Sequence, residues 1–76
     1  MRIRVILHSV LRHRLPPEAG GKTELDLPEG STLSDVAMRL QMTDMVYAIG
    51  GSVERNWTRH LHDNDEVDVF VRAGGG

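Results

Sequence analysis

Polar and hydrophobic residues alternate in three short segments of the chain, which is the pattern of a strand with one buried face. These segments are residues 1–8, 22–27 and 66–71. We expect the first two to pair as a hairpin, joined by a long irregular connection over residues 9–21 with room for one helical turn. In the third, Val67, Val69 and Val71 share one face and Phe70 lies on the other.

A different period marks one helix between these strands. Leu33, Val36, Ala37 and Leu40 fall at i, i+3, i+4 and i+7, which makes one apolar stripe. Ser31 and Thr32 precede the stripe and Asp35 follows Thr32 by three residues, close to a capping box. The sequence therefore predicts a helix over residues 33–41, with all four stripe residues in the core.

Two further strands follow the helix. Residues 46–49 are predicted as one strand and residues 52–53 as a short partner, because Gly50 and Gly51 between them can both take a positive φ. Residues 54–62 form a polar connection anchored by Trp57 and Leu61, and residues 63–65 form a turn. The predicted fold is therefore α+β, with a mixed sheet packed on one helix.

Composition limits what such a chain can do. With 76 residues it is one domain with one thin core, and 39% hydrophobic with 26% charged residues is typical of a globular protein. The net charge of −2 argues against nucleic-acid binding, and the lack of cysteine excludes thiolate metal sites and disulfides. No apolar run reaches a membrane span of about 20 residues, and the N-terminus resembles no signal peptide, so a cytoplasmic location is expected.

The chain ends in Arg72, Ala73 and three glycines, Gly74, Gly75 and Gly76. We expect a β-grasp domain over residues 1–72 and a flexible reactive tail over residues 73–76. Four extended residues reach at most about 13–14 Å, enough to enter the active site of another protein. Glycine allows a narrow tunnel, and a terminal glycine carboxylate is an unhindered acyl group. A frayed terminus is the alternative for such a sequence.

The ordered motifs together resemble a known family. They are the first two strands, the segment LPEGSTLSDV before the helix, the Gly-Gly turn, the segment LHDNDEVDVFV and the terminal Gly75-Gly76. This set resembles the MoaD/ThiS sulfur carriers, which include the small subunit of molybdopterin synthase and the sulfur carrier of thiazole synthesis. The resemblance covers nearly the whole chain and implies a ubiquitin-like β-grasp fold.

The resemblance also implies a function. An E1-like adenylyltransferase of the MoeB/ThiF type would use ATP and magnesium to adenylate Gly76. A sulfurtransferase or other persulfide donor would then convert Gly76 to a thiocarboxylate, which donates sulfur in the site of a synthase large subunit. Gly74 and Gly75 would allow passage of the tail. The chain itself would bind no cofactor or metal and would act as a carrier, or as the small subunit of a synthase, rather than as an enzyme.

Two pathways and two other functions stay open. The long connection over residues 9–21 resembles the molybdopterin type, which we favour, whereas Val53, Arg55 and Trp57 resemble the thiazole type. The same activation chemistry would serve a ubiquitin-like protein modifier conjugated through Gly76. An interaction module with an inert tail is the third hypothesis.

Several other side chains carry weaker predictions. Phe70 is predicted to contact a partner because it lies opposite the valines and near the tail, although a core position is the alternative. Arg72 is predicted to bind an acidic partner surface, with a solvated arginine as the alternative. His60, His62 and Asp63 are too few for a convincing metal site in a loop. Three methionines are expected to fill the core; they are Met38, Met42 and Met45.

Overall fold

The computed structural model of the chain describes residues 1–72. In these residues one sheet contains β1 (Arg2–Leu7), β2 (Lys22–Asp26), β3 (Met45–Ile49), β4 (Ser52–Val53) and β5 (Glu66–Val71). One α-helix, α1 (Leu33–Leu40), and two short 3-10 helices, η1 (Ser9–Arg14) and η2 (Pro17–Ala19), lie between the strands. The tail predicted at residues 73–76 lies outside the described residues, so its flexibility stays a prediction.

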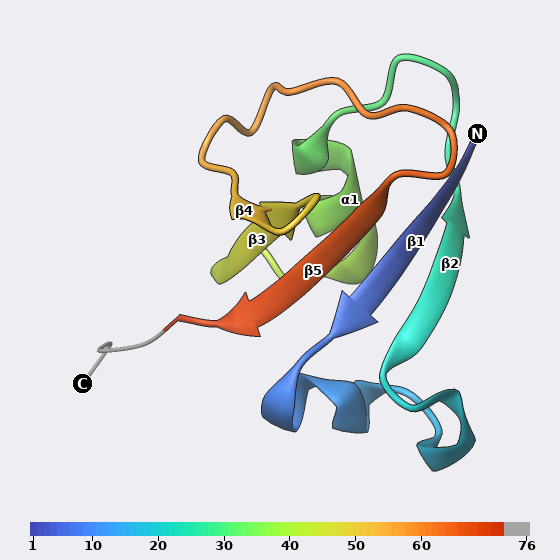
Figure 1. The fold of residues 1–76 in the computed structure, drawn as a ribbon, viewed down its shortest axis with the longest axis vertical. Coiled ribbons are helices and arrows are strands. Elements are labelled where there is room, and N and C mark those ends of the chain that lie inside the picture. Colours follow the sequence, from blue (N-terminus) through green and yellow to red (C-terminus); the bar gives the residue numbers. More distant parts are fainter. Residues whose placement is uncertain (73–76) are drawn as a thin grey trace.

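The sheet is mixed, with the strand order β2-β1-β5-β3-β4. The two central strands, β1 and β5, are parallel, and Val5 pairs with Val67 between them. The other neighbouring strands are antiparallel. The helix α1 lies across one face of the sheet, behind the strands in the view of Figure 1. This confirms the predicted hairpin of the first two strands and the mixed sheet packed on one helix.

The connection between β1 and β2 contains two 3-10 helices rather than the single helical turn expected. It returns to the sheet at Gly21, whose φ is +79°. A Cβ at Gly21 would lie 2.6 Å from the carbonyl oxygen of Leu7, a distance at which atoms collide. Glycine is therefore required where the connection packs against the end of β1.

The connection that follows β4 is tied to the first turn of α1. The backbone N–H of Leu33 donates to the Arg59 carbonyl at 3.0 Å, and the N–H of Ser34 donates to the Trp57 carbonyl at 2.9 Å. The first N–H groups of a helix lack partners inside the helix, so this connection supplies them. The Asp35 carboxylate accepts the Thr32 N–H at 2.8 Å, which confirms the predicted cap.

Both predicted turns have the backbone conformation that their residues favour. Gly50 and Gly51 have φ angles of 60° and 87°, as a tight hairpin between β3 and β4 requires. Asn64 has a φ of 70°, in the left-handed region that asparagine tolerates. The strand after the Gly-Gly turn, β4, is only two residues long, which leaves part of β3 at the edge of the sheet.

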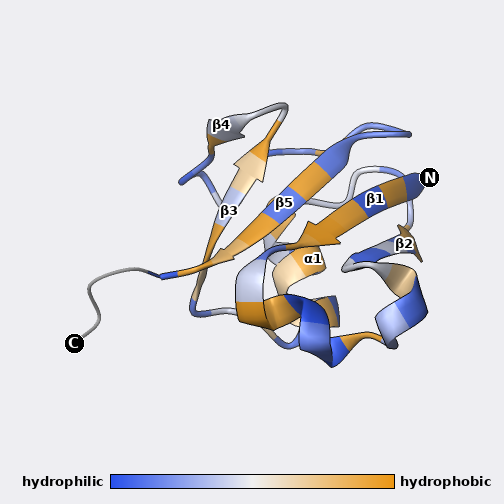
Figure 2. Ribbon diagram, turned by 60° about the horizontal axis from the view of Figure 1, so that its bottom comes forward, coloured by the Kyte–Doolittle hydropathy of each residue, from blue (hydrophilic) through white to orange (hydrophobic). Residues whose placement is uncertain are grey.

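The core lies between α1 and the sheet. The alternation of polar and apolar residues along β1 and β5 is visible in Figure 2 as bands of two colours on each strand. The largest fully buried side chains of the core come from three strands, β1, β3 and β5, and from the helix; they are Ile3, Val5, Leu33, Val36, Tyr47, Val67 and Val69. Met42, Leu61 and Leu11 pack around them.

Three predicted core positions are wrong in whole or in part. Leu40 is only half-buried because it occupies the last residue of α1, at the margin of the core. Val71 is 44% exposed because it occupies the last rung of the β3–β5 ladder, opposite a partly buried Met45. Met38 is 65% exposed because it falls outside the apolar stripe of the helix.

Within residues 1–72, no helix has the length and apolar character that crossing a membrane would need.

Candidate partner-docking site

The candidate site is the end of β5 together with the sheet face that α1 leaves uncovered, which we call the open face. Strand alternation places Phe70 and Asp68 of β5 on this face, because Val67 and Val69 point into the core. Ladder partners of Asp68 on the same face are Ile6 of β1 and Ala48 of β3. Because β5 ends at Val71, the open face includes the end of the strand that precedes the tail.

Phe70 is 37% exposed, and its ring is held by the residue that follows β1. The imidazole of His8 stacks on the phenyl ring with 4.3 Å between centroids and 9° between planes. His8 Nε2 donates to Asp68 Oδ1 at 2.9 Å, and the His8 backbone N–H donates to the Val69 carbonyl at 3.0 Å. One face of the Phe70 ring is therefore covered by His8, and the remainder of the ring is partly exposed.

Sequence reasoning assigned no partner to His8. The residue lies 60 positions from Asp68 and reaches it only because β1 and β5 run in parallel. Strand periodicity shows which face of the sheet a side chain occupies but not which strands are neighbours. The contacts of His8 with Asp68 and Phe70 therefore could not be predicted from the sequence pattern. The predicted exposure of Phe70 agrees with the structure, whereas its role in binding stays a prediction.

Arg72 makes an ion pair inside the chain. Its Nε lies 3.3 Å from Asp44 Oδ1, in the segment just before β3. Both side chains are well exposed, so the pair is screened by water and contributes at most about 1 kcal/mol. An acidic partner surface could replace Asp44 at low cost, and the predicted role of Arg72 in binding stays a prediction.

Tyr47 is a structural residue that sequence reasoning left out. Its hydroxyl donates to the Met42 carbonyl at 2.6 Å, and Trp57 packs edge-on against its ring at 5.4 Å. Burial raises the pKa of the Tyr47 phenol to about 12. The contact between the Tyr47 and Trp57 rings anchors the connection after β4 to β3, as predicted for Trp57.

The two histidines in the connection between β4 and β5, His60 and His62, lie close to polar groups of the chain. His60 Nδ1 lies 2.9 Å from the Gly30 carbonyl, and His62 Nδ1 lies 3.8 Å from Asp65 Oδ2. Within the described residues, no group of three or more potential ligand side chains is arranged to hold a metal ion. Gly74, Gly75 and Gly76, the predicted tail and acyl residues, lie outside the described residues.

Comparisons with known proteins bear on the fold. No protein-family model matches the sequence, and no curated protein matches it. Among solved structures, the chain is similar to a "Putative molybdopterin converting factor, subunit 1" from Pyrococcus furiosus, with a TM-score of 0.75 and 21% identity over 92% of this chain and 95% of that one. It is also similar to SAMP1 from Haloferax volcanii, with a TM-score of 0.73 and 12% identity over the whole of both chains.

These structural matches confirm the predicted ubiquitin-like β-grasp fold. They span 92% and 100% of this chain.

Proposed function

We propose that this chain is a sulfur carrier that is loaded at the carboxylate of Gly76 by a separate ATP-dependent enzyme. The observation that carries the proposal is the structural match to a molybdopterin converting factor subunit over 92% of the chain, in a protein whose sequence ends in three glycines. That match favours the molybdopterin type of carrier, with the thiazole type next. Neither hypothesis asks this chain to supply catalytic groups.

The chemistry needs activation because a carboxylate is a poor electrophile. Attack of the Gly76 carboxylate on ATP forms an acyl-adenylate and releases pyrophosphate, with magnesium held by the partner enzyme. A persulfide then attacks the acyl carbon and AMP leaves. A thiol cleaves the resulting sulfur–sulfur bond, is oxidised to a disulfide, and leaves a thiocarboxylate on Gly76. Enclosure in the partner's site protects these intermediates from water.

The described residues have a recognition role in this scheme. The open face, with the Phe70 ring stacked on His8, includes the end of β5, the strand that precedes the tail. An aromatic side chain of this kind is a common interface anchor. Gly74 and Gly75 would pass a channel that fits bare backbone, which makes tail length and lack of side chains the determinants of loading.

The test is ATP–pyrophosphate exchange with the cognate E1-like adenylyltransferase. Deletion of Gly75-Gly76 should abolish exchange, and so should one extra residue after Gly76, because it moves the carboxylate by about 3.5 Å. Gly75→Val should also fail because a β-branched side chain does not fit such a channel. All three variants should have the same unfolding temperature as the wild-type protein, since they leave residues 1–72 intact.

Mass spectrometry of the protein from its native host identifies the product. Replacement of one oxygen by sulfur on the intact chain supports the carrier. Exchange at the wild-type rate with the truncated chain, together with unmodified protein under all conditions, would leave the inert interaction module as the function.

A ubiquitin-like protein modifier is the second candidate. The fold it needs is the same, and the exposed side chain of Lys22, the only lysine, could accept a further copy of the chain. High-mass conjugates linked through Gly76 to target lysines would favour this function over the carrier.

A further inference from the structure

A stretch of β3 lies at the edge of the sheet without a neighbouring strand. β4 pairs with β3 only at Ala48–Val53 and Ile49–Ser52. One further bond joins the Glu54 N–H to the Tyr47 carbonyl at 2.9 Å. Beyond this point the chain leaves the sheet for the first turn of α1, where Trp57 and Arg59 accept hydrogen bonds. The edge of β3 at Met45 therefore has no strand beside it within residues 1–72.

The backbone groups of Met45 point outward from this edge. In an antiparallel strand, alternate residues direct their N–H and C=O groups to the same side. The Tyr47 carbonyl bonds outward to Glu54, so Met45, two residues earlier, faces the same way. The N–H and C=O of Met45 are thus available to another strand, and the N–H of Tyr47, a residue that is 1% exposed, has no partner within the described residues.

A groove of about 480 Å³ follows this edge. Its lining comes from β3, from β4 and the connection that follows it, and from Arg72 just after β5. Val46, Val53 and Trp57 give it an apolar lining. Val53 and Trp57 are 58% and 37% exposed. Since its lining includes Val46 on the open face and Tyr47 on the helix side, the groove can receive side chains on both sides of an added strand.

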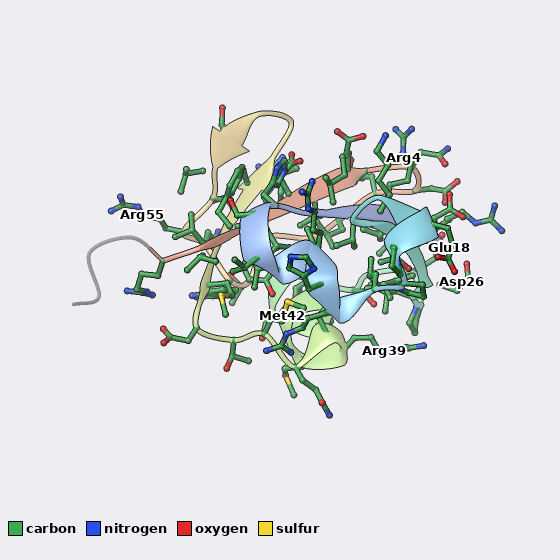
Figure 3. All side chains as sticks on the ribbon, turned by 90° about the horizontal axis from the view of Figure 1, so that it is seen from below. Arg4, Glu18, Asp26, Arg39, Met42 and Arg55 are labelled. Carbon is green, nitrogen blue, oxygen red and sulfur yellow. The ribbon has the colours of Figure 1, made fainter. Side chains whose placement is uncertain are left out.

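The charges of the groove favour an acidic occupant. Arg55 and Arg72 both line it, and Arg55 has no ion-pair partner within residues 1–72. Figure 3 shows Arg55 extending outward near the end of β5. The one acidic lining residue, Glu54, is already paired, because Arg59 Nη1 donates to its carboxylate at 2.6 Å. This bond holds the pKa of the Glu54 carboxyl below its usual value.

The opposite edge of the sheet lacks these features. β2 carries Glu24 and Asp26, both within 3.8 Å of Arg2 on the neighbouring strand. Charged side chains along an edge discourage strand addition. The two edges therefore differ in both charge and available apolar surface.

We propose that the β3 edge, between Met45 and Tyr47, binds an extended acidic segment of a partner protein by strand addition. Main-chain hydrogen bonds to Met45 and Tyr47 give affinity, and Arg55 with Arg72 selects acidic side chains. The inference goes beyond the proposed function, because pairing on this edge requires no reaction at Gly76 and is tested without the activating enzyme.

The test uses the full chain and a capped peptide, Glu-Val-Glu-Val-Glu. Trp57 is the only tryptophan and lines the groove, so its fluorescence reports binding. Amide hydrogen exchange should slow at Met45 and Tyr47 when the peptide binds. A Lys-Val-Lys-Val-Lys peptide should bind at least about fivefold more weakly. An N-methylated acidic peptide, which cannot pair, should not protect these amides.

Two variants and a matched control make the test sharper. Arg55→Glu should weaken binding of the acidic peptide at least about fivefold, whereas Arg39→Glu, in α1 and away from Arg55 in Figure 3, should change it less than about twofold. Met45→Pro removes an N–H that the fold does not use, so the variant should fold and lose binding. Val46→Pro should instead disrupt the sheet, because its N–H faces β5.

Several outcomes overturn the proposal. These are equal binding of the acidic and basic peptides, protection at β2 instead of β3, or no protection at about 1 mM peptide. A dimer held through the β3 edge, detected by sedimentation equilibrium and abolished by Met45→Pro, would assign the edge to a second copy of the chain instead.

Discussion

Tyr47 makes two contacts that join separate segments of the chain, one through its buried hydroxyl and one through its ring. The phenol donates to the Met42 carbonyl, while the ring packs against Trp57. Figure 3 labels Met42 on the helix side of the sheet, beneath the strands. A neutral phenol suits this position because it keeps the donated hydrogen bond, whereas a phenolate would be buried as an unpaired charge.

This environment predicts a defined alkaline transition. Burial raises the pKa of Tyr47 from 10.0 to about 12. The folded state therefore favours the neutral phenol, so its contribution to stability is complete below pH 10 and is lost as the pH rises through about 12. Since Tyr47 is the only tyrosine, tyrosinate absorbance of the native protein should rise near pH 12.

The control is Tyr47→Phe. Its free energy of unfolding should be lower by about 1 kcal/mol at neutral pH, because the Met42 carbonyl loses its donor, and it should show less decline between pH 10 and pH 12. A tyrosinate transition at the ordinary value in the folded protein would contradict the buried hydrogen bond.

Single residues also show where sequence reasoning reached its limit. The exposure of Phe70 followed from alternation along one strand, and the structure agrees with it. The stacking of His8 on Phe70 and the pairing of Arg72 with Asp44 depend on which strands and loops become neighbours. Local patterns carry no information on such long-range contacts, so these partners became visible only in the fold.

At the scale of elements, strand and turn positions could be predicted because each follows from local chemistry. The Gly50-Gly51 turn, the Asp35 cap and the alternation in β1 and β5 all appear in the structure. Errors concentrate where elements end, because burial there depends on how far the covering element extends. Leu40 and Val71 fall at the expected positions of the apolar pattern, but they lie at the ends of their elements, where the packing partner no longer covers them fully.

The two ends of α1 should therefore differ in their contribution to stability. Leu33 is fully buried at the start of the helix, so Leu33→Ala should lower the free energy of unfolding by about 2–5 kcal/mol. Leu40→Ala, at the half-buried end, should cost less than about 2 kcal/mol. Urea denaturation of both variants measures the difference. Equal losses would mean that Leu40 is as well packed as Leu33, contrary to its position at the core margin.

At the scale of the whole molecule, the fold places the core on one face of the sheet and the proposed recognition groups on the other face and at one edge. The helix side holds the core, while the open face and the β3 edge hold exposed aromatic, apolar and basic groups. The parallel pairing of β1 and β5 at the centre brings His8 to the end of β5. The proposed recognition groups therefore gather around the end of β5, the strand that precedes the tail, which is where we expect a partner that acts on Gly76 to bind.

This separation predicts opposite effects for two adjacent residues of β5. Val69 is fully buried and Phe70 is 37% exposed. Val69→Ala should cost about 2 kcal/mol of stability but leave binding to the activating enzyme unchanged per folded molecule. Phe70→Ala should cost less than about 1 kcal/mol of stability and weaken the complex by more than about 1 kcal/mol, as expected for an interface anchor.

Calorimetric titration of each variant with the cognate activating enzyme, corrected for the folded fraction, measures these effects. His8→Ala should have a smaller effect of the same kind as Phe70→Ala, because it frees the Phe70 ring to rotate and adds the cost of ordering it on binding. If Phe70→Ala unfolds the protein while binding per folded molecule stays at the wild-type level, Phe70 belongs to the core. In that case the open face around Phe70 is not the docking surface, and the enzyme must recognise the chain elsewhere.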